Sequence, residues 1–417
     1  MVDEGIADWL GESADRMVEL QRELTARPAL GPENGGEGEW EKARFLEGWL
    51  REQGLDDIRH YDCPDDRVSE GTRPNFVATL PGRGEAPPVW VLTHLDVVPP
   101  GEKSEDGSWR GWDSDPWQLR REGDTIYGRG VCDNQHSMVA SIFAALALLQ
   151  TEATPPGPVR LLLVADEETG SGRGLQYLLQ EHRDLFGEDD LILVPDGGNA
   201  DGTMIEVAEK SVLWLQFHLR GEQVHASRPD QGVNAFRAAS HLVARLDEAL
   251  PARFDAQDEL FHPPRSTFEP TLHKANVPNV NTVPGEDVFC FDCRVLPEYP
   301  LGDVLSYVRN ECRSIDARFD TQTEVSMRHS FQAAPGTDPD APVVRRLESA
   351  VRAVYEVEPR TMGIGGQTVA SFFRREGLPA VVWMTSTETE HQVNERCSVP
   401  ELVGDARVFA RVYANEG

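Results

Sequence analysis

The segments VWVLTH (89–94), SMVASIFAALALLQ (137–150), VRLLLVAD (159–166) and LILVPD (191–196) decide the fold class of this chain. Three of them are short apolar runs typical of buried strands, and the segment 137–150 is long enough to form a helix. Short buried strands that alternate with helices indicate a mostly parallel sheet covered on both faces. The first half of the chain is therefore predicted to be an α/β structure.

The flanking sequence predicts a second domain inserted into this α/β domain. Upstream, helical periodicity in 6–26 and 38–53 precedes a strand at 75–80. From about residue 211 the order becomes strand, helix, strand, strand, helix, strand, which is that of a ferredoxin-like α+β unit. From about residue 340 the pattern returns to helix, strand and a C-terminal helix. The predicted domains are 1–210 together with 331–417, and an insertion at 211–330.

The net charge excludes some classes of partner. The chain carries a formal charge of −31, so nucleic acid and anionic membranes are not expected to bind it. Of its 40 basic residues only Lys42, Lys103, Lys210 and Lys274 are lysines. This balance is typical of halophilic archaea, whose acidic surfaces stay soluble in molar salt that screens their self-repulsion.

The N-terminal segment and the cysteines indicate a cytoplasmic protein. Residues 1–17 are acidic and amphipathic, and no apolar stretch reaches membrane-spanning length. The six cysteines are therefore expected to be reduced thiols. Cys290 and Cys293 form a CxxC inside a strand-like segment, whose alternation sends them to opposite faces.

Metal-ligand side chains follow the predicted strands, where an open α/β sheet keeps its active site. Two imidazoles and several carboxylates form a nitrogen and oxygen set suited to zinc. The candidates are His94 and Asp96 after one strand, Glu167 and Glu168 after the next, Asp196 after a third, Asp133 before a helix, and His391 before the last helix.

Each candidate taken alone also fits an ordinary structural role. Among 71 acidic residues, a single aspartate or a glutamate pair is usually solvated surface. His94 is more specific, because it ends an apolar strand with Asp96 beside it, where a carboxylate can fix the imidazole tautomer. The ordered occurrence of all these residues favours a metal site.

The motifs HLDVVPPG, GRGVCDN, DEETG, VPDGG, VHASRP and EHQVNE resemble, in order and spacing, those of one enzyme family. It contains aminoacylase, acetylornithine deacetylase, succinyl-diaminopimelate desuccinylase and carboxypeptidase G. The resemblance covers nearly the whole chain. It implies a zinc-peptidase-like catalytic domain with two Zn²⁺ ions per chain, for which Co²⁺ or Mn²⁺ can substitute. It also implies that the inserted domain is a lid that forms a homodimer.

The resemblance also implies a role for each motif residue. Zinc lowers the pKa of bound water to about 7, so that a carboxylate can remove its remaining proton. The implied roles are His94 and Asp196 on one metal, Glu168 and His391 on the other, Asp133 bridging both, Glu167 as general base, Asp96 as partner of His94, His225 reaching into the partner's site, and Asn281, Arg294 and Gly366 binding substrate.

The substrate is less well determined than the reaction class. Asn134, Gln135 and Gln367 depart from residues common in the family and border the expected substrate pocket. An N-acyl amino acid deacylase of the deacetylase or desuccinylase type is favoured, because such biosynthetic steps suit a cytoplasmic enzyme. A dipeptidase or carboxypeptidase is the alternative. A non-catalytic scaffold is the least favoured alternative, because a family member that has lost activity usually also loses the general base or some of the metal ligands, and this chain retains all of them.

Overall fold

The computed structural model describes residues 4–415. The chain divides into two compact units. The first unit comprises the chain up to residue 207, residues 337–362 and the chain from residue 368; the second comprises 208–336 and 363–367. The residues of the predicted insertion, 211–330, all lie in the second unit, which also contains 208–210, 331–336 and 363–367.

The first unit is built on a mixed sheet with a parallel centre. Its strand order is β1-β4-β8-β5-β9-β18-β10-β17, and β8, β5, β9 and β18 are parallel neighbours, whereas β1, β4 and β10 pair antiparallel at the margins. The strands are β1 (Asp57–His60), β4 (Phe76–Leu80), β5 (Val89–His94), β8 (Val159–Val164), β9 (Leu191–Val194), β10 (Met204–Glu209), β17 (Arg360–Ile364) and β18 (Ala380–Val382).

Helices cover both faces of this sheet. As a result, every residue of the central strands β5 and β9 is buried. Helices α4 and α8 contact the central strands. Helices α5 and α9 share a core cluster with alternate residues of β5 and β9, such as Trp90 and Ile192. The helices are α1 (Glu4–Glu12), α2 (Ala14–Thr25), α3 (Trp40–Glu52), α4 (Gln135–Gln150), α5 (Leu175–Glu181), α8 (Pro342–Tyr355), α9 (Ala370–Arg375) and α10 (Val399–Ala414).

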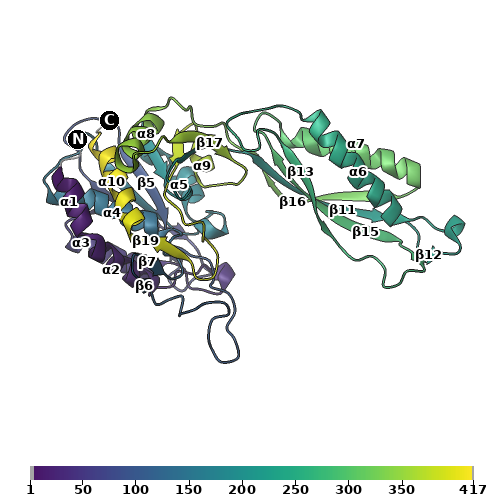
Figure 1. Cartoon of the computed structure of the whole chain (residues 1–417), viewed down its shortest axis with the longest axis horizontal. Coiled ribbons are helices and arrows are strands. Elements are labelled where there is room, and N and C mark those ends of the chain that lie inside the picture. Colours follow the sequence, from purple (N-terminus) through teal and green to yellow (C-terminus); the bar gives the residue numbers. More distant parts are fainter. Residues whose placement is uncertain (1–3, 416–417) are drawn as a thin grey trace. The chain divides into compact units, whose positions relative to one another are not determined.

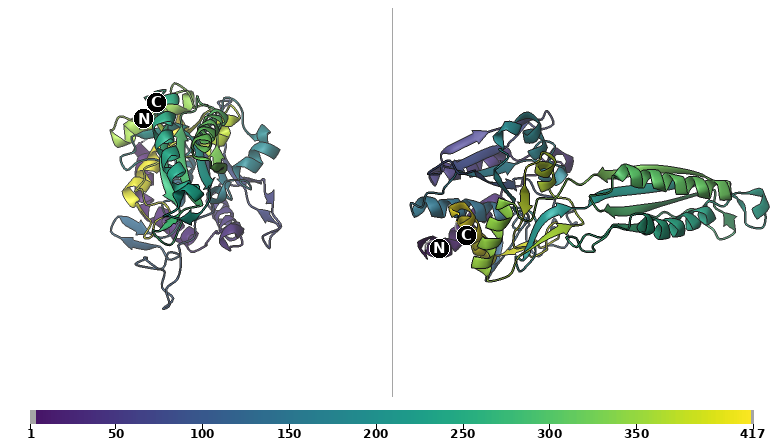
Figure 2. Two further views of the ribbon diagram at one scale, coloured as in Figure 1. Left: turned by 90° about the vertical axis from the view of Figure 1, so that its right-hand side faces the viewer. Right: turned by 90° about the horizontal axis from the view of Figure 1, so that it is seen from above.

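The second unit confirms the ferredoxin-like order. Its antiparallel sheet has the order β13-β15-β11-β16. Helices α6 and α7 lie side by side on one face and bury a common core with Phe217, Phe289 and Phe291 (Figures 1 and 2). The elements are β11 (Ser211–Arg220), α6 (Ala235–Arg253), β13 (Thr267–His273), β15 (Glu286–Val295), α7 (Leu301–Phe319) and β16 (Gln322–Phe331).

Short elements complete the two units. Within residues 4–415, no helix is long and apolar enough to cross a membrane. All six cysteines are free and buried. The short strands are β2 (Cys63–Pro64), β3 (Thr72–Arg73), β6 (Arg120–Glu122), β7 (Thr125–Tyr127), β12 (Val224–His225), β14 (Thr282–Val283) and β19 (Arg396–Ser398), and the 3-10 turns are η1 (Pro32–Asn34), η2 (Glu167–Thr169), η3 (Arg183–Leu185) and η4 (Pro229–Gln231).

Two predicted elements end differently in the structure. The helix expected over 6–26 is interrupted at Ser13, two residues after the weak helix former Gly11. The strand expected to run to residue 166 ends at Val164, because Asp166 adopts a left-handed conformation with φ of 64°. This turn lets Glu167 and Glu168 leave the line of the strand.

Candidate metal centre

The candidate ligands come from the carboxyl ends of adjacent parallel strands. His94 is the last residue of β5, Glu168 lies in η2 after β8, and Asp196 follows β9. Because β5 pairs in parallel with both β8 and β9, these three strand ends meet at one edge of the sheet. Asp133 precedes α4, and His391 precedes β19.

The side chains form two groups, one around His94 and one around His391, and the two groups share Asp133. The Nε2 atom of the buried His94 lies 2.9 Å from Asp133 Oδ1 and 3.5 Å from Asp196 Oδ1. The Nε2 atom of His391 lies 3.1 Å from Asp133 Oδ2 and 3.0 Å from Glu168 Oε2. Each carboxylate oxygen of Asp133 therefore faces a different imidazole, an arrangement in which one carboxylate can serve two cations.

The donor atoms fit divalent metal ions. His94, Glu167 and Asp196 offer donor atoms within 4.8 Å of one another, and so do His94, Asp133 and Glu168. The Oε1 atom of Glu168 is buried without a hydrogen-bond partner in the described structure. A buried carboxylate oxygen without a donor is costly unless a cation reaches it. Imidazole nitrogens and carboxylate oxygens without thiolates suit zinc and similar ions.

The pKa shifts of the candidate ligands also favour the binding of divalent cations. Burial alone would lower the pKa of His94, but hydrogen bonds to Asp133 and Asp196 raise it well above its usual value. Hydrogen bonds to Asp133 and Glu168 raise the pKa of His391 to about 10. Burial raises the pKa of Glu168 to about 7. The carboxylates thus retain protons on the imidazoles, and a divalent cation would displace those protons.

Glu167 lies beside this cluster. Burial, followed by the negative charge of Asp196, raises the pKa of the Glu167 carboxyl well above its usual value. Perturbed carboxyl groups of this kind are common at sites of proton transfer. The side chain is therefore suited to hold and release a proton.

Asp96 has a different main contact from the one expected. The sequence suggested that its carboxylate fixes the His94 imidazole. In the structure, Nδ1 of His94 lies 3.0 Å from the Asp96 backbone oxygen and 3.5 Å from its Oδ1 atom. The carboxylate instead accepts the backbone N–H groups of Glu167 and Glu168, both at 3.0 Å. Asp96 therefore holds the turn that carries the two glutamates, and fixes His94 through its carbonyl.

A buried ionic network contacts the backbone at two places next to the site, at the turn that carries Glu167 and Glu168 and at the end of β5. Arg73 pairs with Glu39, both fully buried, and the Glu39 carboxylate accepts the backbone N–H of Asp166 at 3.4 Å. The ammonium group of Lys42 donates to the carbonyl of Leu95 at 2.8 Å, between His94 and Asp96.

Sequence reasoning did not identify this network. A usable signal was present at Lys42, because it shares the buried face of α3 with Leu46 and Leu50. A lysine on the apolar face of an amphipathic helix needs a partner.

The other predicted site residues lie in the second unit, in two separate pairs. The exposed His225 is close to Asn281, whose carbonyl accepts the backbone N–H of Ala226 at 2.8 Å. Arg294 is close to Gly366, since its Nη1 atom donates to the carbonyl of Gly365 at 2.8 Å. The second unit does not bring the two pairs together.

Strand register separates these pairs. Arg294 pairs with Val212 at one end of the β11–β15 ladder, whereas Glu286 pairs with Arg220 at the other. Beyond that second end, Gly221 donates to Gly285, and β12 pairs with β14 next to His225. The eight residue steps from Glu286 to Arg294 span about 27 Å along an antiparallel strand.

Comparison with known proteins places these observations in a family context. Residues 90–415 match the model of peptidase family M20/M25/M40. The chain is 35% identical to an uncharacterised metallohydrolase of Methanococcus maripaludis over 95% of its own length and 98% of the relative's. It is 24% identical to a succinyl-diaminopimelate desuccinylase of a Nitratiruptor species, over 95% and 98% of the two chains. Human carnosine dipeptidase 1 shares the fold, with a TM-score of 0.72 and 18% identity over 99% and 98% of the two chains.

Proposed function

The chain belongs to peptidase family M20/M25/M40, a family of metal-dependent peptidases and amidohydrolases, and we propose that it hydrolyses the amide bond of an N-acyl amino acid. The observation that carries this proposal is the position of Asp133, whose two carboxylate oxygens face His94 and His391, with Glu167 beside the cluster. This arrangement provides two cation positions and a proton acceptor within one small volume.

In this proposal, one divalent ion is held by His94 and Asp196 and a second by Glu168 and His391, with Asp133 contributing to both. Zinc is the favoured metal, with cobalt or manganese as substitutes, because the donors are imidazoles and carboxylates. When bound, such ions supply Lewis-acid chemistry, increasing the acidity of water and polarising a carbonyl group.

The residues of the chain perform the remaining steps. Glu167 removes a proton from the attacking water and later donates a proton to the leaving amine. Asp96 accepts the backbone N–H of Glu167 and lies beside His94, so it links the turn that carries the base to a proposed metal ligand. Because Glu167 is not among the proposed metal ligands, its carboxylate remains available for proton transfer.

Arg294 is suited to bind the carboxylate of an amino-acid substrate. Its Nε and Nη2 atoms donate to Asp292 at 2.6 and 2.9 Å, and its Nη1 atom donates to Gly365. These contacts use three of the five guanidinium N–H groups and fix the side chain. One N–H remains on each of Nη1 and Nη2, and the guanidinium can offer two such groups to a carboxylate in a two-pronged contact. Gly366 is proposed to contact the same substrate, whereas Asn281, which lies beside His225, is proposed to contact substrate together with that histidine.

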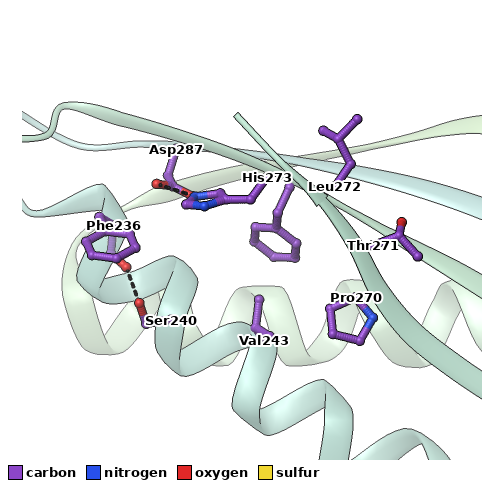
Figure 3. A pocket seen from close by; sticks show the side chains of 9 residues that line it. Phe236, Ser240, Val243, Pro270, Thr271, Leu272, His273 and Asp287 are labelled. Atoms are coloured by element: carbon purple, nitrogen blue, oxygen red, sulfur yellow. Dashed lines mark hydrogen bonds and ion pairs between the residues drawn. The ribbon is translucent and has the colours of Figure 1, made fainter. Parts of the chain in front are cut away.

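We further propose that the protein is a homodimer formed through the second unit. Strand β13 lies at the edge of its sheet, and most of its side chains are exposed. Leu272 of this strand and Phe236 of α6, each 46% exposed, border a hollow of about 390 Å³ (Figure 3). An open strand edge with exposed apolar side chains favours pairing with a second copy.

The separation of Arg294 from His225 supports a role for the second subunit. An amino-acid-sized substrate bound by Arg294 is out of reach of the His225 in the same unit, because about 27 Å of strand lies between the two ends. If both residues contact one substrate, His225 must come from the partner. This geometry agrees with the expectation that His225 acts across the dimer.

A dipeptidase or carboxypeptidase activity is the second candidate. Human carnosine dipeptidase 1 shares the fold of this chain over nearly the whole length of both proteins. A succinyl-diaminopimelate desuccinylase, in contrast, is among the sequence relatives of this chain. A deacylase is favoured because a biosynthetic step suits the cytoplasmic location expected from the sequence. A non-catalytic scaffold is disfavoured, because Glu167 and all five proposed ligands are present.

A hydrolysis screen tests the proposal. The purified protein, in molar salt with added zinc or cobalt, is offered N-acetyl amino acids, N-succinyl amino acids and dipeptides. Turnover is expected to be highest for an N-acyl amino acid and to be lost in Glu167→Gln. Preferential cleavage of dipeptides would favour the second candidate, and no turnover of any of the three classes would contradict an amide hydrolase of this type.

A further inference from the structure

The carboxylate of Glu395 is bonded entirely to the loop that carries Asp133. Its Oε1 atom accepts the backbone N–H groups of Cys132 at 2.9 Å and Asp133 at 3.0 Å. Its Oε2 atom accepts the backbone N–H of Gly130 at 3.0 Å and Nη1 of Arg129 at 2.6 Å. The side chain is fully buried. Four donors from one loop therefore converge on one carboxylate.

Glu395 also belongs to the segment that carries His391, only four residues earlier in the chain. This segment is attached to the neighbouring loop by Asn394, whose Oδ1 atom accepts the backbone N–H of Asp113 at 2.9 Å. The Nδ2 atom of Asn394 donates to the carbonyl of Gly111 at 3.3 Å. Glu395 thus joins the loop of Asp133 to the segment of His391 through a short, anchored connection.

We propose that Glu395 is a positioning residue that holds the Asp133 carboxylate between His94 and His391 and thereby sets the affinity of the protein for divalent metal. This inference rests on the proposed function, because it assigns Asp133 to metal binding. The alternative is that Arg129 and Glu395 form a buried ion pair that contributes to stability alone. The hydrogen bonds favour the positioning role, because the backbone N–H of Asp133 is itself one of the four donors to Glu395. An ion pair that served stability alone would require only Arg129.

A carboxylate is required at this position because all four partners are donors. In Glu395→Gln one oxygen becomes an NH₂ group, which would face either Cys132 and Asp133 or Gly130 and Arg129, and in both orientations donors would oppose donors. The loop must then shift or lose two hydrogen bonds. Substitutions that disturb the support of metal ligands typically weaken metal binding or activity by about 10–100-fold.

Glu206→Gln is the matched control. Glu206 is also a fully buried carboxylate of the first unit, and its Oε1 atom pairs with Nη1 of Arg374 at 2.7 Å. Its arginine partner lies in α9, a helix that carries none of the proposed ligands. The control therefore reproduces the loss of a buried carboxylate without disturbing the Asp133 loop.

The experiment compares wild type, Glu395→Gln and Glu206→Gln after metal removal. Zn²⁺ affinity is measured by competition with a chromogenic chelator, the Co²⁺-loaded proteins are compared by visible absorption, and folding is followed by thermal unfolding. Glu395→Gln is expected to bind Zn²⁺ about 10–100-fold more weakly, to show an altered Co²⁺ spectrum, and to recover part of its kcat in excess Zn²⁺. Glu206→Gln is expected to lose only stability.

The outcomes separate this inference from the proposed function. If wild type binds metal and hydrolyses substrate while Glu395→Gln is folded and keeps wild-type Zn²⁺ affinity, the positioning role is wrong and the proposed function stands. If wild type binds no metal, both are wrong. Should Glu395→Gln not fold, Arg129→Lys disturbs the same contact more mildly, and wild-type metal affinity in that variant would contradict the positioning role.

Discussion

In the first unit, the carboxylates that support the candidate metal centre, those of Asp96, Glu39 and Glu395, are buried and accept backbone N–H groups, whereas in the second unit His225 is exposed. The first unit fixes its turns with buried carboxylates, as Asp96 does for Glu167 and Glu168. The second unit instead presents an open strand edge and exposed apolar side chains beside β13. This difference underlies our proposal that the first unit is preorganised for chemistry and that the second unit acts by association with a second copy.

Among the tests of this comparison, metal removal is expected to have the largest effect, which is loss of the hydrolytic activity of the first unit. The proposed ligand set gives each ion three protein ligands, with Asp133 shared, so a chelator should abolish hydrolysis. Metal analysis should show two zinc-class ions per chain, and added zinc or cobalt should restore activity. Full activity in excess chelator, with only trace metal in the protein, would exclude a metal-dependent first unit.

The neighbours Glu167 and Glu168 provide the next largest effect. In Glu167→Gln, kcat should fall by about 10² to 10⁴ with both metals retained and the Michaelis constant little changed, because Gln keeps the shape but cannot accept a proton. In Glu168→Ala, the affinity for one metal should fall instead, with partial rescue by extra zinc. Near-normal turnover of Glu167→Gln would remove the general-base assignment.

Subunit complementation tests whether the second unit acts by association. A His225→Ala chain and a Glu167→Ala chain should each be inactive as homodimers. In a heterodimer, the site that retains Glu167 receives His225 from the other chain, so part of the activity should return. Heterodimers purified through two different affinity tags are assayed, and no recovery in them would rule out a trans role for His225.

The smallest expected effect is that of salt on the stability of the protein. This measurement tests the repulsion between surface charges and does not test the candidate metal centre. A net charge of −31 repels itself most strongly when the Debye length is long, about 10 Å at 0.1 M salt against about 3 Å at 1 M. The midpoint of thermal unfolding should therefore rise between about 0.1 and 2 M potassium chloride. An unchanged midpoint over this range would show that the inference of a halophilic habitat is wrong.

The sequence alone was sufficient for the main elements of both units. Strand β5 has the bounds expected from VWVLTH, and the second unit has the expected order of strands and helices, because burial imposes local periodicities that can be counted. The short strands β10 and β17 and the short helix α9 were not identified. Glutamates interrupt the apolar side chains of β10, β17 contains Gly363, and α9 has only six residues, so none of the three carries a clear periodic signal.

What the sequence determined by itself was the set of candidate ligands, since strand ends and ordered motifs single out His94, Glu168 and Asp196. Only the tertiary structure decided how they are supported. Glu395 and Glu39 could not be distinguished from the other acids in a chain with 71 acidic residues. Their burial and their bonds to Asp133 and Asp166 depend on contacts between segments far apart in sequence. A local pattern reports which side of an element is buried, whereas the partner of a buried charge is set by the packing of the whole unit.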